Sequence, residues 1–504
     1  MKKINLFKKN KNQQENFSSY RKTIECSFFN KVNKYNSDSI ILSNDIYMPI
    51  ENNLVKNLNT FILGRAGSGK SRFFIRPNIL QANTSLIIND VGGFLLREHG
   101  NFLKENGYKI KYLNLHNKRK SMKYNPFKYI FNDLDIYSMV DCIIDNTFGI
   151  EIKNKNKKEY FHMSEKALLG AFINYFVKNI PKNEQTLKKL KEMIINFNKE
   201  SFDSLENLDI SFYELLEESI EYWQMDDFKR LCSSTIIDDV LESIIERLSI
   251  FDDKYTQPLM LEDEFELEKL GFEKIALFII PETMSIKYMG ISSMFMNQVI
   301  DMFIRNGEEE NKKTPNFTFP FHTRFIFDDF PSIGKIPKLG NRIPLINKYN
   351  ASINILIQTL NQIKDLYKDE SIDGTFRENL ILKSCDIFIF AGSSNFEDIE
   401  YACSRLPGYL RISCNLHSPN AKPSSKSATI VKEIIYKKVF GVIVKEIIEF
   451  NIDYGVHDYL QRIYLDYCVV SIGEHAFVTK RYELKEHPNY ETCGEVNYNY
   501  FEFE

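Results

Sequence analysis

The stretch that most constrains the fold is a short apolar segment running directly into a glycine-rich loop, Asn59-Thr-Phe-Ile-Leu-Gly-Arg-Ala-Gly-Ser-Gly-Lys-Ser71. The fixed positions of the pattern G-x-x-x-x-G-K-[ST] are filled by Gly64, Gly69, Lys70 and Ser71. That pattern binds phosphate when a strand precedes it and a helix follows it. The sequence therefore predicts a strand, a phosphate-binding loop and a helix that begins near Lys70.

The residue types in this loop suit a triphosphate. Glycines let the backbone N–H groups approach the phosphates, and the positive end of the following helix faces the same charge. Lys70 adds a cation, and the Ser71 hydroxyl can ligate Mg²⁺. We predict that ATP contacts Gly64, Arg65, Ala66, Gly67, Ser68, Gly69, Lys70 and Ser71. The alternative is a glycine turn that binds nothing.

Composition excludes several classes of protein. A chain of 504 residues has room for about three domains. The net charge of −3 gives no global attraction to nucleic acid or to an anionic membrane. The eight cysteines are scattered, with no C-x-x-C pair and no Cys/His spacing typical of zinc, which favours a reducing cytosol. No apolar run approaches the ~18 residues of a transmembrane helix, so we expect a soluble chain.

Apolar runs alternate with helical stretches on both sides of a long polar region. Buried strands are predicted at 84–90, 108–115, 274–280, 324–327, 352–357 and 386–390, with β-leaning segments at 439–444 and 468–472. This alternation predicts an α/β fold with a mostly parallel sheet. Residues 306–314 are predicted to form a charged surface turn.

The region from about 130 to 250 has a different pattern. Amphipathic helices are predicted at 164–177, 184–198, 212–222 and 238–248. We therefore divide the chain into a basic polar arm (1–37), a nucleotide-binding domain in two parts (38–128 and 253–490), an inserted all-α domain (129–252) and a polar C-terminal tail (491–504).

A pair of carboxylates follows a later apolar strand, Phe325-Ile-Phe-Asp-Asp329. P-loop ATPases need such a strand to complement Mg²⁺ and to activate water. Asp328 is the predicted metal ligand together with Ser71, and Asp329 the predicted general base. Gln358 ends the next strand and could sense the γ-phosphate or orient the water. The alternatives are an Asp pair that caps a turn and a Gln that merely ends a strand.

Beyond the loop itself, the order of several motifs resembles the type IV coupling proteins, the TraG/TraD-like conjugative DNA-transfer ATPases, in the branch found in Gram-positive mobile elements. The motifs are Arg76-Pro-Asn-Ile-Leu-Gln-Ala-Asn83, Asn106-Gly-Tyr-Lys109, Tyr124-Asn-Pro-Phe127, Ser164-Glu-Lys-Ala-Leu-Leu169, Phe327-Asp-Asp-Phe-Pro-Ser-Ile-Gly-Lys-Ile-Pro337, Gln358 and His487-Pro-Asn-Tyr490. The resemblance extends from about Ser39 to Tyr490.

This resemblance implies a RecA-like P-loop ATPase domain interrupted by an all-α domain. It implies a ring of six subunits that uses ATP and Mg²⁺. Its partners would be DNA, in single-stranded form with an attached relaxase, and the proteins of a type IV secretion channel. Many family members have N-terminal membrane helices. Here we expect a chain at the cytoplasmic face of the plasma membrane that contacts the membrane only through partners.

Three departures from the family pattern bear on hydrolysis. The family's Asp-Pro-Lys-Gly-Glu is replaced by Asp90-Val-Gly-Gly-Phe94, and its second acid, Glu, by Asp329. Its Arg pair aligns with Asn347 and Tyr349, which leaves Lys348 as the cation between them. A transition-state cation can be worth orders of magnitude in rate.

Three hypotheses for the function therefore remain open. The first is an ATP-driven coupling protein that recruits and translocates DNA, with Lys70, Asp329 and Gln358 as catalytic residues. The second is a divergent assembly subunit that binds ATP and docks partners without efficient hydrolysis. The third, a P-loop kinase or metabolic ATPase, fits the loop but not the helical insertion. Lys335, Lys338, Arg342 and Lys348 are candidate channel cations, or else ordinary surface residues.

Overall fold

A computed structural model describes most of the chain. The described residues are 37–51, 55–149, 155–196, 236–283, 285–367, 379–405, 431–439, 442–450, 466–473 and 475–503. They form two compact units. The first unit comprises the described residues within Met1–Asn83, Leu356–Gln362 and Cys385–Tyr490, and the second comprises those within Thr84–Ile355, Ile363–Ser384 and Glu491–Glu504. Residues 1–36 of the predicted arm at 1–37 lie outside the described residues, and so does the predicted helix at 212–222.

Nine strands form the main sheet, in the order β13-β12-β9-β3-β8-β7-β4-β6-β5. Their bounds are Thr60–Leu63 (β3), Ser85–Asn89 (β4), Lys109–Asn114 (β5), Ile275–Ile280 (β6), Thr323–Phe327 (β7), Ala351–Ile357 (β8), Ile387–Phe390 (β9), Tyr467–Ile472 (β12) and His475–Lys480 (β13). The neighbours from β9 to β5 whose registers are resolved pair in parallel, whereas β12 is antiparallel to both β9 and β13. The predicted α/β class with a mostly parallel sheet is confirmed.

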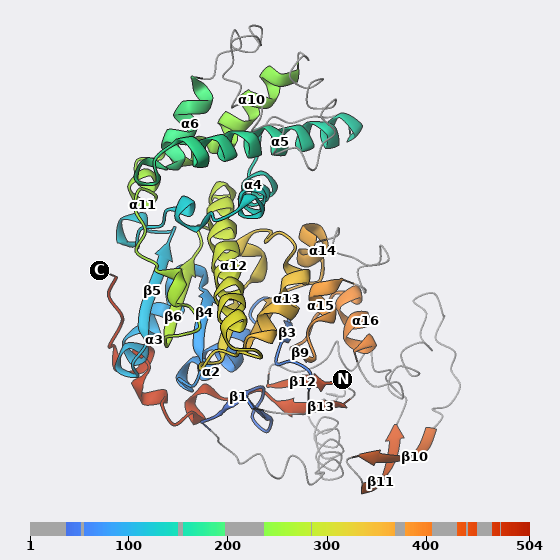
Figure 1. Cartoon of the computed structure of the whole chain (residues 1–504). Coiled ribbons are helices and arrows are strands. Elements are labelled where there is room, and N and C mark those ends of the chain that lie inside the picture. The colour runs from blue at the N-terminus through green and yellow to red at the C-terminus, as the bar shows by residue number, and fades with distance from the viewer. Residues whose placement is uncertain are drawn as a thin grey trace, which may run out of the picture. The chain divides into compact units, whose positions relative to one another are not determined.

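The central strands are buried throughout and mostly apolar, because both faces of a parallel sheet are covered by helices. Every residue of β4, β6, β7 and β8 is buried. In the second unit, α12 (Met289–Lys313) extends along the sheet, with α13 (Leu339–Lys348) beside it and α3 (Phe94–Glu105) near β5 (Figure 1). Packing under α12 is tight, since a Cβ atom at Gly307 would lie 2.5 Å from the Tyr349 ring.

The described elements between 133 and 247 are helices. They are α4 (Asp133–Asn146), α5 (Lys155–Asn179), α6 (Leu187–Ile195) and α10 (Ile236–Arg247), with the short α11 (Thr256–Leu259) after them. These helices pack on one another, and α4 packs on α12. A buried ion pair joins α10 to α5, in which Arg247 donates two hydrogen bonds to the Glu165 carboxylate at 2.7 and 2.9 Å.

The first unit begins with an antiparallel hairpin of β1 (Ser39–Ile41) and β2 (Tyr47–Pro49). Asn78 of α2 (Arg76–Leu80) holds this hairpin by accepting from Ile41 N at 2.9 Å and donating to Ile41 O at 2.8 Å. Its other elements include α16 (Phe396–Ser404) and a separate hairpin of β10 (Val431–Val439) and β11 (Val442–Phe450). Of the predicted β-leaning segment 439–444, residues 440 and 441 lie outside the described part of the chain.

The C-terminal segment packs on the second unit along α3. Phe501 N donates to Arg97 O at 2.8 Å. Phe501 also contacts Gly100, where a Cβ atom would lie 2.6 Å from the ring. Phe501 and Phe503 both contact Tyr112 of β5 edge to face. Aromatic contacts thus hold a segment that the sequence presents as a polar tail.

One prediction about the second unit is wrong. Residues 306–314 do not form a surface turn, because α12 continues to Lys313. The charged run is the solvent-facing end of a long helix, where Lys313 pairs with Glu310 three residues earlier at 2.6 Å.

Candidate nucleotide-binding site

The predicted phosphate loop begins at the end of β3, in the first unit. Gly64 N donates to Ile357 O at 3.2 Å, and Arg65 N donates to Gly392 O at 3.0 Å. A Cβ atom at Gly64 would lie 2.8 Å from both Ala391 Cβ and Ser68 Oγ. The first glycine of the motif is therefore required by close packing at the strand end.

Gly67 and Gly69 serve a different purpose, because both have left-handed backbone angles. Their φ values are +72° and +77°, and a Cβ atom at either position would meet nothing within 4 Å. Glycine is needed here for conformation and leaves the backbone open on the outside. The side chain of Ser68 between them is buried, and its Oγ has no hydrogen-bond partner among the described residues. An open backbone and an unsatisfied hydroxyl fit a loop that receives phosphate oxygens.

Lys70 lies over this loop. Its Nζ donates to Gly64 O and, at 3.3 Å, to Arg65 O. Lys70 is half-buried while Arg65 is exposed. The ammonium group is thus held at the loop by main-chain carbonyls, where a cation can meet the charge of a polyphosphate.

The predicted helix is present, but its first turn is unusual. Ser71–Ile75 forms a π-helical turn (η2) that continues directly as α2. Phe73 N donates to Gly69 O at 2.9 Å, and the residues from Phe73 to Ile75 are buried. Those apolar contacts fix the start of the helix. Ser71, the predicted Mg²⁺ ligand, remains half-buried at its N-terminus.

Arg481 supports the loop through hydrogen bonds to backbone carbonyl groups. The sequence pattern did not predict this role. Its guanidinium donates to Ser68 O at 2.5 Å, to Ala391 O at 2.7 Å and, through Nε, to Tyr467 O at 2.9 Å. Burial lowers the pKa of Arg481 from its ordinary value. An arginine 413 residues from Ser68 has no motif that could reveal it.

Gln358 follows β8 directly. Its neighbour Ile357 accepts the hydrogen bond from Gly64 N, so the structure brings Gln358 close to the start of the loop. The backbone N–H of Gln358 donates to Gln362 Oε1 at 2.8 Å. Both the loop and Gln358 belong to the first unit.

The two aspartates belong to the second unit, directly after β7. Both are half-buried. Asn89 Nδ2 donates to Asp328 O and to Ser332 Oγ, each at 2.8 Å. Asp329 has a left-handed backbone with a φ of 52°, which Asn and Asp tolerate better than most residues. The chain thus turns sharply between the two carboxylates. Their oxygens are the donors that Mg²⁺ prefers.

Asp90 caps α3, and it is one of the two residues, with Gly93, that this chain keeps from the Asp-Pro-Lys-Gly-Glu motif. Its carboxylate accepts from Leu95 N at 3.1 Å and from Leu96 N at 2.8 Å. Burial raises the pKa of Asp90 to about 7, and the nearby negative charge of Asp328 adds to this shift. Gly92 and Gly93 follow with φ values of +81° and +71°. This motif therefore builds the turn into α3.

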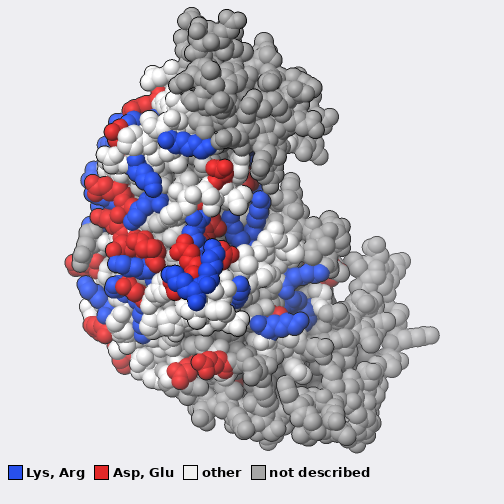
Figure 2. Space-filling model, viewed as in Figure 1, with Lys and Arg blue, Asp and Glu red and all other residues white. Residues whose placement is uncertain are grey.

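Two of the four candidate channel cations have partners inside the second unit. Lys335 pairs with Asp145 at 3.2 Å, and Arg342 pairs with Asp301 at 3.4 Å. Lys338 and Lys348 are exposed, and the Lys348 ammonium lies 5.0 Å from the Tyr349 ring centre. On the described residues of the face in Figure 2, basic and acidic side chains are intermixed.

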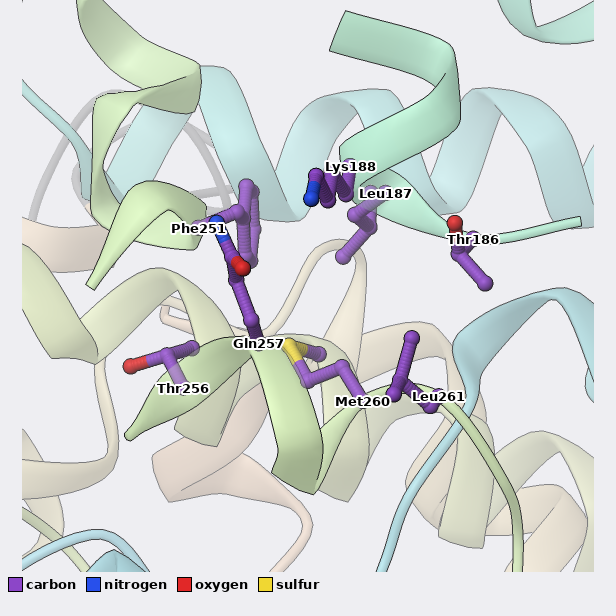
Figure 3. A pocket seen from close by; sticks show the side chains of 8 residues that line it. All are labelled: Thr186, Leu187, Lys188, Phe251, Thr256, Gln257, Met260 and Leu261. Atoms are coloured by element: carbon purple, nitrogen blue, oxygen red, sulfur yellow. The ribbon is translucent and has the colours of Figure 1, made fainter. Parts of the chain in front are cut away.

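A small pocket in the second unit lies beside α6 and α11 (Figure 3). Lys188 is its only charged lining residue, and no carboxylate lines it. It therefore lacks the groups that would hold a metal-bound nucleotide. The pocket is lined by Thr186, Leu187, Lys188, Phe251, Thr256, Gln257, Met260 and Leu261.

Among the described helices, none has the length and apolar character needed to cross a membrane.

Comparison with known proteins places this chain in a family. The model of the family described as type IV secretory system conjugative DNA transfer matches residues 9–432. No curated protein matches the sequence. The plasmid coupling protein TrwB in complex with ADP and Mg²⁺ is similar in structure, with a TM-score of 0.58, 14% identity, and 92% of this chain and 93% of that chain covered. The unbound bacterial conjugative coupling protein TrwBΔN70 gives a TM-score of 0.57 at 13% identity, with 91% of each chain covered.

At such identities the likeness to TrwB shows a common fold. The family model covers well over half of the sequence and includes both the phosphate loop and the two aspartates. The chain belongs to the type IV secretory system conjugative DNA-transfer family.

Proposed function

We propose that this protein is an ATP-dependent coupling protein that recruits DNA with its relaxase and translocates it to a type IV secretion channel. The observation that carries the proposal is the loop 64–71. It has the two left-handed glycines and the lysine of a phosphate site, in a chain that belongs to a conjugative DNA-transfer family. Structures of TrwB with ADP and Mg²⁺ and with a non-hydrolysable ATP analogue support nucleotide binding by this fold.

Each site residue has a proposed role. The backbone from Gly64 to Ser71 and the Lys70 ammonium hold the phosphates, and the Ser71 hydroxyl and the Asp328 carboxylate hold Mg²⁺. Asp329 accepts the proton of the attacking water, and Gln358 orients that water. Bound Mg²⁺ would supply charge neutralisation at the phosphates.

The working assembly we propose is a homo-hexamer at the cytoplasmic face of the plasma membrane, with single-stranded DNA as its cargo. Contact with the membrane runs through the channel proteins. The near-neutral charge is compatible with DNA passage because a ring repeats each cation of one subunit six times, and exposed Lys338 and Lys348 remain available.

ATP turnover with and without DNA tests this function. The wild-type protein should hydrolyse ATP, and single-stranded DNA should stimulate it. Lys70→Ala should lower turnover by about 10²-fold or more, as loss of a positioned electrostatic group does. Lys56→Ala removes an exposed cation of the same unit and is the matched control, for which we expect wild-type turnover.

The outcomes separate the functions. Wild-type hydrolysis in Lys70→Ala would remove the site assignment. Tight ATP binding without turnover, with or without DNA, would select the assembly subunit instead, to which the altered motif at 90–94 and the single cation Lys348 point.

A further inference from the structure

Three side chains with metal-binding groups meet between α3 and the C-terminal segment. Glu98 and His99 are consecutive residues of α3, and Cys493 lies just before the short helix α19 (Gly494–Asn497). One ligand atom from each of the three lies within 4.8 Å of those of the other two. His99 and Cys493 are fully buried, whereas the Glu98 side chain is 12% exposed.

The fold brings these groups together by contacts that need no ion. A Cβ atom at Gly494 would lie 2.9 Å from Glu98 O, so the backbone of the C-terminal segment touches α3 beside the cluster. Further along, Phe501 N donates to Arg97 O, and its ring covers Gly100. Packing of the segment that follows Cys493 thus pre-positions the thiol over α3.

We propose that Glu98, His99 and Cys493 bind a zinc ion that fastens the C-terminal segment to α3. Thiolate, imidazole and carboxylate are the three ligand types that zinc takes in proteins. The thiolate makes Mg²⁺ and Ca²⁺ poor occupants because both prefer oxygen ligands alone.

Charge supports a divalent ion in a buried place. With the thiol deprotonated, the imidazole neutral and the carboxylate ionised, the three ligands carry two negative charges in sum. A Zn²⁺ ion cancels that charge, which removes the large cost of burying unpaired ions. On binding, the Cys493 thiol releases its proton to solvent, so affinity rises with pH.

The geometry requires only a small adjustment. Tetrahedral zinc, with bonds of about 2.0–2.3 Å, places its ligand atoms about 3.5 Å apart. Glu98 Oε2 and His99 Nε2 are 3.9 Å apart. The Glu98 side chain, which is 12% exposed, can move to close the set, and a water molecule would be the fourth ligand of a tetrahedral zinc ion. Because His99 and Cys493 are buried, a small ion can reach them more easily than a substrate can.

Zinc binding to the full-length protein tests this proposal independently of ATP turnover. After removal of metal with a chelator, the protein should bind one equivalent of Zn²⁺. With Co²⁺ in its place, thiolate-to-cobalt charge-transfer absorption should appear in the near ultraviolet. Glu98→Gln and Cys493→Ser should each weaken binding by at least about tenfold, and Cys493→Ser should abolish the charge-transfer band. Cys403→Ser, which changes another buried cysteine in the first unit, should bind as wild type.

Amide hydrogen exchange tests the proposal on the wild-type protein alone, so the result does not depend on whether a variant folds. Zinc added to the metal-free wild-type protein should slow exchange in residues 493–503 and in α3. The proposal is overturned if the wild type binds no stoichiometric zinc, if Cys493→Ser binds as tightly as the wild type, or if zinc leaves exchange in these segments unchanged.

Discussion

The side chain of Asn146 forms hydrogen bonds in both directions with the backbone of Lys335. Lys335 N donates to Asn146 Oδ1 at 2.6 Å, and Asn146 Nδ2 donates to Lys335 O at 2.9 Å. Asn146 ends α4, and Lys335 lies shortly after the aspartate pair. Gly334, which lies between the aspartate pair and Lys335 in the sequence, has a φ of +87°. A Cβ atom at Gly334 would lie 2.5 Å from Asn146 Oδ1. The segment after the carboxylates is therefore fastened to the helical region within the second unit.

Asn146→Ala should lower the free energy of unfolding by about 1–3 kcal/mol, because it removes the hydrogen bond from Lys335 N and one of the two hydrogen bonds to Lys335 O, whose other donor is Ser293 Oγ. Urea unfolding followed by circular dichroism measures this loss. ATP turnover should fall as well if the fastening holds the aspartates in place. A variant as stable as the wild type would show that water replaces the side chain without cost.

Gly67→Ala should weaken ATP binding by about tenfold or more, which is about 1.4 kcal/mol. Gly107→Ala is its matched control, since Gly107 also has a positive φ (+82°) and open space where a Cβ atom would stand. Each change should cost about 1–2 kcal/mol of stability through backbone strain. Titration with Mg²⁺-ATP separates them, and equal losses of affinity in both variants would mean that strain alone is responsible.

Asp329→Asn should reduce ATP turnover by about 10²–10⁴-fold while ATP still binds, because the amide cannot accept the proton of the attacking water. Asn tolerates the left-handed backbone at this position, so the fold should be kept. Asp329→Ala should lose turnover and also some stability. Wild-type turnover in Asp329→Asn would exclude Asp329 as the general base.

His162→Gln should flatten the pH dependence of stability above pH 6. His162 of α5 hydrogen bonds to Asp145 at 3.2 Å and lies 3.7 Å from Glu165, while the Lys166 ammonium nearby opposes its charge. The two carboxylates raise the pKa of His162 above its unfolded value of about 6.5. Stability from the imidazolium is therefore full below pH 6.5 and is lost as the pH rises through the folded pKa. Urea unfolding at pH 6 and pH 8.5 measures the free energy of unfolding at each pH. An identical change between the two pH values in the wild type and in His162→Gln would contradict the prediction.

Strands and the phosphate loop could be predicted because local sequence determines them. Runs such as Ile275–Ile280 are apolar at every position, which in a chain of this length means a strand covered on both faces. The glycines and Lys70 fill a pattern whose spacing is fixed by the loop they build. The hairpin partner His475–Lys480 was missed because its polar ends hide the strand pattern.

What the sequence hides are contacts between distant residues. Arg481 and Cys493 stand in no motif, and each meets its partners only after the chain has folded. The Cys/His spacings typical of zinc sites do not reveal this cluster for the same reason, because Cys493 is remote in sequence from His99. At 306–314 the charged composition fits a surface turn and an exposed helix end equally well, so composition alone could not predict the end of α12.

The support that Arg481 gives the phosphate loop has a consequence for biosynthesis. A ribosome completes the whole Gly64–Ser71 sequence long before it reaches the arginine, which lies 413 residues beyond Ser68. Until then the carbonyl oxygens of Ser68 and Ala391 lack the guanidinium that holds them together. The phosphate loop thus gains this support only after residue 481 has been translated, and a product terminated before that residue would keep every residue of the motif without the arginine that holds the loop.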